Sequence, residues 1–278
     1  MGRFQAHIVT EDHGRATSSY SYLIDNREKV GDWVYTRTGA PRLSKDFSPR
    51  SSARFAGLNY LIVILGGSFS EAFVRQRLVV LGDASATAAN IAANEPLMRL
   101  AFAADMIPLL LNMVLAAILY QLFRVVSKQG ALAATFFVLA SSAVQAAAMA
   151  FHIAAIIVLR GSPAFAAFDP GQLESLSYLF LRLHAYTYTI ALLFFGGGAL
   201  TLGVLLLRST FMPRLLGLLM CLAGFCYLAN SMLYFVAPNL SSIALLLPAL
   251  LGEGGLTLWF LLVGLNETAW RRQAGLEA

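Results

Sequence analysis

Polar side chains inside long apolar stretches are the residues of this sequence that can bind a ligand or move charge. The candidates for ligand binding are Glu71, Arg75, Arg99, Asp105, His184, Tyr188, Asn230 and Glu253. Ionisable groups are costly to place in hydrocarbon, so those that occur there commonly line a substrate or ion pathway. Glu71 and Arg75 lie four residues apart, and so do His184 and Tyr188. Residues at this spacing share one face of a helix, so each pair can make contact.

Two histidines raise the alternative of a cofactor site. His152 and His184 are candidate metal ligands, with Asp105 and Glu253 able to supply carboxylate oxygens. The same two imidazoles could instead be the axial ligands of a haem. No HExxH or comparable motif accompanies them, so the cofactor stays unassigned. No Ser–His or Cys–His arrangement of a hydrolase stands out, so no catalytic residue is predicted.

Each candidate also has a purely structural interpretation. Arg75 and Arg99 lie near the ends of apolar stretches, where a long basic side chain can reach the membrane interface. Asn230 can be a hydrogen-bond partner between helices. Asp105, His184 and Glu253 are the hardest to explain in this way, because each is deep or poorly flanked.

The stretches that position these residues predict an all-α membrane bundle of six transmembrane helices. Of the 278 residues, 58% are hydrophobic and only 13% are charged, and the mean hydropathy is +0.67. A soluble domain carries about 25% charged residues, so a soluble fold is excluded and a lipid bilayer is the expected partner. About 20 apolar residues suffice for one crossing. The expected spans are residues 55–74, 100–123, 131–159, 178–207, 215–237 and 241–265.

The basic residues predict the orientation of this bundle. The net charge is +5, and most of the arginines and lysines fall in the N-terminal segment, in alternate loops and at the C-terminus. This bias predicts a multi-pass protein of the cell membrane with both termini in the cytoplasm. It also explains the positive charge without nucleic acid. Arg75, Arg77 and Arg99 depart from the rule, because they flank an outside segment.

Three segments follow from this pattern. Residues 1–54 are expected to be a polar, disordered cytoplasmic tail, residues 55–266 the transmembrane domain, and residues 267–278 a short cytoplasmic tail. In this orientation most polar candidates map to the outer half of the membrane. We therefore expect a polar cavity that is open to the exterior and sealed on the cytoplasmic side.

Five stretches carry a resemblance to a known family. They read ARFAGLNYLIVILGGSFSEAFVRQRLVVLGDASATAANI (53–91), RLAFAADM (99–106), FLRLHAYTYTIALLFFG (180–196), PRLLGLLMCLAGFCYL (213–228) and LLLPALLGEGGLTLWFLLVGLN (245–266). In this order they resemble the bacterial domain-of-unknown-function 4386 family. The resemblance implies a multi-span membrane protein and brings no activity with it. The long polar N-terminal segment departs from the family pattern, in which the first helix lies near the start.

The leading functional hypothesis is therefore a protein that binds or transports a small solute or a lipid headgroup. One alternative is a membrane-embedded enzyme or a metal- or haem-binding protein that uses the same residues. A second alternative is a structural or accessory subunit whose polar residues only join helices. The sequence assigns no oligomeric state.

Overall fold

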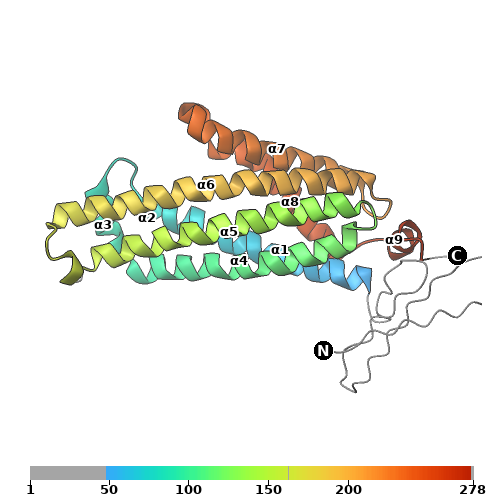
Figure 1. Ribbon diagram of the computed structural model, residues 1–278, viewed down its shortest axis with the longest axis horizontal. Helices are drawn as coiled ribbons and strands as arrows, with labels where there is room; N and C mark the ends of the chain where they lie inside the picture. Colours follow the sequence, from blue (N-terminus) through green and yellow to red (C-terminus); the bar gives the residue numbers. More distant parts are fainter. Residues whose placement is uncertain (1–47, 162, 277–278) are drawn as a thin grey trace, which may run out of the picture. The chain divides into compact units, whose positions relative to one another are not determined.

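The computed structural model describes residues 48–161 and 163–276, and its regular elements are all helical (Figure 1). The all-α prediction is therefore confirmed for this part of the chain. The predicted N-terminal tail lies outside the described residues as far as residue 47, while its last six residues, 49–54, belong to the first helix.

Six of the described helices are long and apolar enough to cross a membrane. The first crossing is continuous from α1 (Pro49–Ser68) through the π-helical segment η1 (Phe69–Arg75) into α2 (Gln76–Leu78). The others are α4 (Glu95–Phe123), α5 (Lys128–Leu159), α6 (Pro170–Arg208), α7 (Arg214–Val236) and α8 (Leu247–Leu262). The number and order of the predicted spans are confirmed.

Short helices complete the described chain. They are α3 (Ala84–Ala93), the 3₁₀ turns η2 (Pro163–Phe165), η3 (Pro238–Leu240) and η4 (Ile243–Leu246), and the terminal α9 (Glu267–Gln273). Two expectations therefore change in detail. The apolar run 241–265 is not one helix, because two 3₁₀ turns precede α8 and Pro248 sits in its first turn. The segment expected as a C-terminal tail contains α9.

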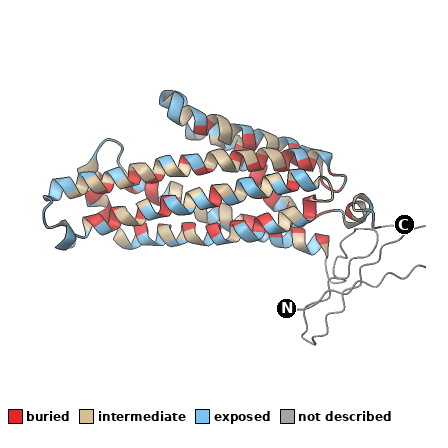
Figure 2. Cartoon of the chain, in the orientation of Figure 1, coloured by how far each residue is buried: buried red, intermediate tan, exposed pale blue. Residues whose placement is uncertain are grey.

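The six crossing helices pack in a closed ring. Each has two main neighbours, in the order α1, α4, α5, α6, α7, α8 and back to α1. Helix α3 covers one end of the ring, where it packs on α6 and contacts α2, α4 and α5 (Figure 1). Buried positions alternate along each helix with exposed apolar ones such as Leu110, Phe225 and Leu258 (Figure 2). In a bilayer these outward apolar side chains would face lipid, because the transfer of apolar surface from water into hydrocarbon is favourable.

Glycines set the closest approach in the ring. Along α6 and α7, Gly196 opposes Gly224 and Gly203 opposes Gly217, which is the register of two antiparallel helices. A Cβ atom on Gly224 would lie 2.4 Å from the backbone nitrogen of Leu200. Small residues let membrane helices approach closely enough for backbone contact, so these positions hold α6 against α7.

The end of the bundle at which α1 begins and α8 ends is tied together by side chains, and we call it the basic end. Arg50 Nε donates to the carbonyl of Val263 at 3.2 Å, and Arg54 Nη2 donates to that of Leu262 at 3.3 Å. These carbonyls close α8, where unpaired acceptors and the helix dipole favour a cation. Trp270 of α9 is buried, and its indole N–H donates to the carbonyl of Leu122 at 2.8 Å.

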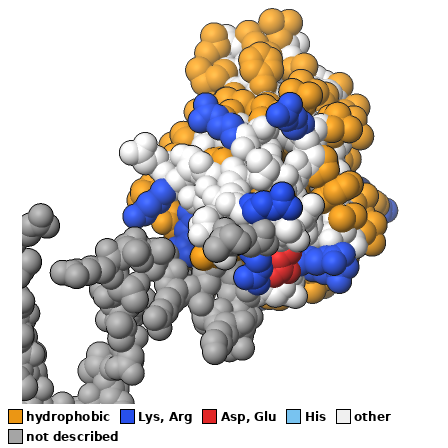
Figure 3. All heavy atoms as spheres, turned by 90° about the vertical axis from the view of Figure 1, so that its right-hand side faces the viewer, with side chains coloured by type: hydrophobic (Ala, Val, Ile, Leu, Met, Phe, Trp, Pro, Cys, Tyr) orange, Lys and Arg blue, Asp and Glu red, His pale blue; other side chains and the backbone are white. Residues whose placement is uncertain are grey.

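Charge is distributed unequally between the two ends. The described basic residues at the basic end are Arg50, Arg54, Arg124, Lys128, Arg208, Arg214, Arg271 and Arg272. Figure 3 shows this end, with basic side chains spread over the face and a single acidic patch among them. Glu267 is the one acidic residue there within the described chain. The opposite end, which α3 covers, carries both signs.

Candidate functional site

The π-helical segment η1 builds the polar site in the first crossing. A π turn is wider than an α turn and is frequently found at functional positions. Within it, Ser70 donates a hydrogen bond to the carbonyl of Ala101 on α4 at 3.0 Å, and both groups are buried. This contact fixes η1 against α4, so Glu71 and Arg75 are held at a defined height beside Asp105.

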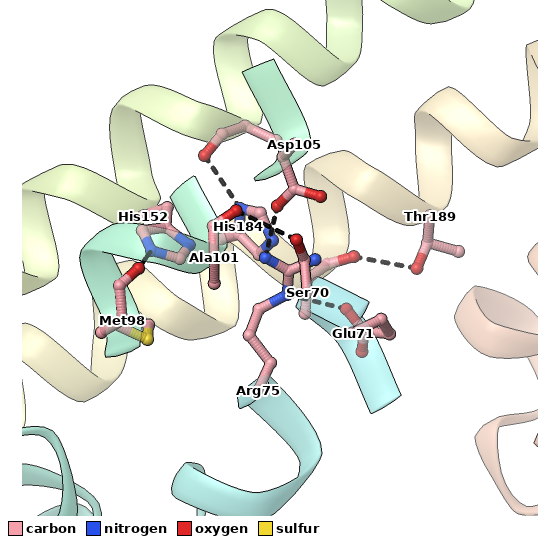
Figure 4. Close-up of polar contacts among 11 residues, drawn as sticks. Ser70, Glu71, Arg75, Met98, Ala101, Asp105, His152, His184 and Thr189 are labelled. Atoms are coloured by element: carbon pink, nitrogen blue, oxygen red, sulfur yellow. Dashed lines mark hydrogen bonds and ion pairs between the residues drawn. The ribbon is translucent and has the colours of Figure 1, made fainter. Parts of the chain in front are cut away.

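Arg75 is the centre of this site (Figure 4). Its Nε donates to Glu71 Oε2 at 2.8 Å, which confirms the pair expected from the four-residue spacing. Its Nη1 donates to Asp105 Oδ2 at 2.6 Å. The side chains of Arg75 and Asp105 are 6% and 1% exposed, whereas that of Glu71 is 42% exposed. The ion pair between Arg75 and Asp105 is therefore the buried one. Glu71 lies between this pair and the surface of the bundle.

Two histidines stand beside Arg75. His152 on α5 and His184 on α6 are buried, and their ring centres lie 5.6 Å apart in an edge-on arrangement. One nitrogen of each ring contacts a backbone carbonyl at 3.0 Å: Nε2 of His152 that of Met98, and Nδ1 of His184 that of Ala148. A carbonyl can only accept, so these nitrogens carry the protons, and His152 Nδ1 and His184 Nε2 are the acceptors of the neutral rings.

Three buried polar atoms without a partner in the described chain lie in this neighbourhood. Among the described residues, no hydrogen-bond partner exists for Arg75 Nη2, His152 Nδ1 or His184 Nε2, and all three atoms are buried. The guanidinium acts electrostatically on both imidazoles, which places the three side chains in one neighbourhood. We call Glu71, Arg75, Asp105, His152 and His184 the Arg75 cluster. It offers one free donor nitrogen, which carries two N–H groups, and two free acceptor nitrogens.

Tyr188 extends the cluster toward the middle of the bundle. Its ring stacks on that of His184, with the ring centres 6.1 Å apart. The charged groups that act on it electrostatically are Glu71, Arg75 and Asp105 of the cluster, and Glu253. Glu253, on α8, is buried between the side chains of Tyr60 on α1 and Tyr227 on α7, whose hydroxyl groups are its hydrogen-bond partners. Asp105 and His184 therefore belong to one cluster. Glu253 forms a separate group with Tyr60 and Tyr227.

Two predicted candidates lie elsewhere. Arg99 pairs with Glu95 at 2.7 Å on the surface at the α3 end, and Glu95 also pairs with Arg160. The Asn230 side chain accepts hydrogen bonds at 3.1 Å from the hydroxyl group of Ser241 and the backbone N–H of Ser242, which orders the turn between α7 and α8. These contacts give both residues a structural role.

Tyr60 was absent from the residues singled out by sequence. A tyrosine at a membrane interface is expected at the end of a span, but Tyr60 lies roughly 16 Å along α1 from Pro49 at 1.5 Å per residue. The position of Tyr60 deep within the span can be read from the sequence alone, so this residue could have been predicted. Ser70 could not have been found in this way, because its role depends on its contact with α4.

A partly open cavity of about 40 Å³ lies toward the basic end. Its walls come from α1, α4, α5, α6 and α7, and they are largely apolar, with Tyr60, Tyr120 and Thr135 as the polar exceptions. This space is distinct from the outward-facing polar cavity expected from the sequence, which stays a prediction.

The described residues contain no group of three or more His, Cys, Asp or Glu side chains that could hold a metal ion. Catalytic zinc sites commonly use three protein ligands, and His152 and His184 provide two. The Arg75 guanidinium beside them would also repel a cation.

The ring of six crossing helices with a polar cluster in its interior defines a multi-pass helical membrane protein. The family model described as "Domain of unknown function (DUF4386)" matches residues 55–264, so the chain belongs to that family and the resemblance seen in the sequence is confirmed. No curated protein and no solved structure matches the chain.

Proposed function

We propose that the protein binds a small polar solute or lipid headgroup at the Arg75 cluster, and that it moves this ligand across the membrane. The observation that supports this proposal is the set of three buried nitrogens without a partner among the described residues, one donor and two acceptors. A buried polar atom without a hydrogen bond costs roughly 1–3 kcal/mol. A ligand that satisfies several such atoms at once recovers that cost.

The chemistry of the cluster narrows the ligand. Two carboxylates face one guanidinium, so the cluster has excess negative charge when all three groups are ionised. The free imidazole nitrogens accept hydrogen bonds, and the N–H groups of the free guanidinium nitrogen donate them. A hydroxyl- or amine-bearing molecule fits this combination, because its O–H or N–H groups can reach the imidazoles while an oxygen accepts from Arg75.

Thermal-shift measurements on the purified protein in detergent test this proposal. The probes are glycerol, ethanolamine and serine, each of which carries hydroxyl or amine donors. We expect at least one probe to raise the melting temperature of the native protein, and this rise to be lost in His184→Phe and in His152→Phe. Arg99→Gln is the matched control, because Arg99 lies outside the cluster. A probe that stabilises the histidine variants as strongly as the native protein would contradict the proposed site.

The charge distribution supports an orientation for this transport. We propose that the basic end faces the cytoplasm, because positively charged segments are retained on that side of a membrane. The Arg75 cluster then lies in the outer half. Both described ends of the chain, at α1 and α9, lie at the basic end. A C-terminal alkaline phosphatase fusion should be inactive and a C-terminal green fluorescent protein fusion should fluoresce, and the reverse result would invert the orientation.

A further inference from the structure

Glu253 is a buried carboxyl group that the Arg75 cluster does not use. It is 7% exposed, and its Oε1 atom is buried without a hydrogen-bond partner among the described residues. None of the ion pairs in the described chain includes it. The groups that face it are tyrosines: Tyr60 from α1, Tyr227 from α7 and, at longer range, Tyr188 from α6.

An ionised carboxylate is poorly supported in this position. Two tyrosine hydroxyls can donate to it, but the remaining oxygen would keep its charge with no donor and no cation nearby. An isolated buried charge costs far more than an unpaired neutral group, and such a carboxyl group ordinarily takes up a proton instead. A neutral carboxyl group loses only one hydrogen bond here, at Oε1. Burial and the tyrosine-only surroundings therefore favour the protonated group.

A metal cation is a poor substitute for this proton. Sodium or another hard cation needs about six oxygen ligands, several of them anionic or carbonyl oxygens. Around Glu253 the side-chain oxygens are the two tyrosine hydroxyls and, one helical turn away on α8, Thr257 Oγ1, which is also buried without a partner among the described residues. Among the described residues, no group of three or more His, Cys, Asp or Glu side chains could hold a metal ion here.

Tyr188 is the described residue that has electrostatic neighbours in both polar groups. Glu253 acts electrostatically on Tyr188, and so do Glu71, Arg75 and Asp105 of the Arg75 cluster. Glu71 is the member of this series with a substantially exposed side chain. Tyr60, the partner of Glu253 on α1, lines the largely apolar cavity toward the basic end.

We infer that Glu253 is a proton-binding site in the interior of the membrane bundle, which exchanges its proton with the α3 end through Tyr188 and the Arg75 cluster. The ligand of this second site is a single proton, so the inference goes beyond the binding of a solute at the Arg75 cluster. Tyr60 and Tyr227 orient the carboxyl group by donating hydrogen bonds to its carbonyl oxygen. The Tyr188 hydroxyl group relays the proton between Glu253 and the Arg75 cluster.

Infrared spectroscopy of the full chain in lipid vesicles tests the site without any solute, so its outcome is independent of the proposed solute binding. At neutral pH we expect the carbonyl stretch of a protonated carboxyl group. This band should disappear in Glu253→Gln and persist in Glu174→Gln, which removes a carboxyl group near the start of α6. If Glu253→Gln does not fold, Tyr227→Phe provides the second measurement, because loss of a donor to the carbonyl oxygen moves the band to higher frequency.

Transfer of the vesicles into D₂O tests the route. The Glu253 band should shift as the proton exchanges, and the exchange should be several-fold slower in Tyr188→Phe. Three results would overturn the inference: a carboxyl spectrum at neutral pH that Glu253→Gln and Tyr227→Phe both leave unchanged, a Glu253 band that never shifts in D₂O, or an exchange rate that is unaffected in Tyr188→Phe.

Discussion

Replacement of Asp105 by asparagine is the sharpest test of the Arg75 cluster. The change keeps the shape of the side chain and removes the charge that Arg75 contacts at 2.6 Å, in a pair whose side chains are 6% and 1% exposed. Removing one partner from a buried ion pair costs about 3–5 kcal/mol, because the other charge is left uncompensated.

Glu71 reduces this cost. It contacts Arg75 Nε at 2.8 Å, so the guanidinium keeps one counter-charge in the Asp105→Asn variant. We therefore expect a loss near the lower limit, about 3 kcal/mol in the free energy of unfolding. Glu71→Gln should cost less than about 1 kcal/mol, since its side chain is 42% exposed and the buried pair remains.

Reversible chemical unfolding in detergent micelles measures both variants. The double variant Arg75→Met with Asp105→Leu supplies the decisive comparison, because replacing both ions by apolar side chains of similar volume is often neutral. The double variant should be more stable than Asp105→Asn alone. The reasoning is refuted if Asp105→Asn costs no more than Glu71→Gln, or if the double variant is the least stable of the three.

Three further predictions concern the packing of the bundle. Gly224→Ala should lower the free energy of unfolding by about 1–3 kcal/mol, and with it the melting temperature, because its Cβ would lie 2.4 Å from a backbone nitrogen of α6. Gly254→Ala is the control and should change the melting temperature little, since no atom lies within 4 Å of the added Cβ. Trp270→Phe should cost about 1–3 kcal/mol and expose α9 to limited proteolysis, because the carbonyl of Leu122 loses its donor; unchanged protease resistance would contradict this. Gly66→Ala should destabilise α1 against α4, since its Cβ would lie 2.7 Å from both the Ala104 carbonyl oxygen and the Pro108 ring; a thermal-shift result equal to that of Gly254→Ala would argue against this contact.

The spans and several local pairs could be predicted from the sequence because they depend on short-range regularities. Apolar length alone located the six crossings. Four-residue spacing correctly paired Glu71 with Arg75, and it also placed His184 against Tyr188. Such pairs need only one helix, so no tertiary information is required.

The assembly of the site could not be predicted, because it depends on which helices are neighbours. Nothing in the spacing of Asp105 says that it meets Arg75 instead of Glu253. That choice is made by the order of helices in the ring, in which α1 lies between α4 and α8. The partition of the polar residues into the Arg75 cluster and a separate Glu253 group follows from the same order.

The closure of α8 on α1 has a consequence for how the protein is made. Arg50 and Val263, which this closure joins, are separated by 213 residues, so their contact must wait until the last crossing has left the ribosome. The earlier crossings already contain every member of the Arg75 cluster, whereas Glu253 arrives only with α8. During synthesis the nascent bundle therefore has a lateral seam beside α1, and insertion of the last helix both seals that seam and delivers the central carboxyl group.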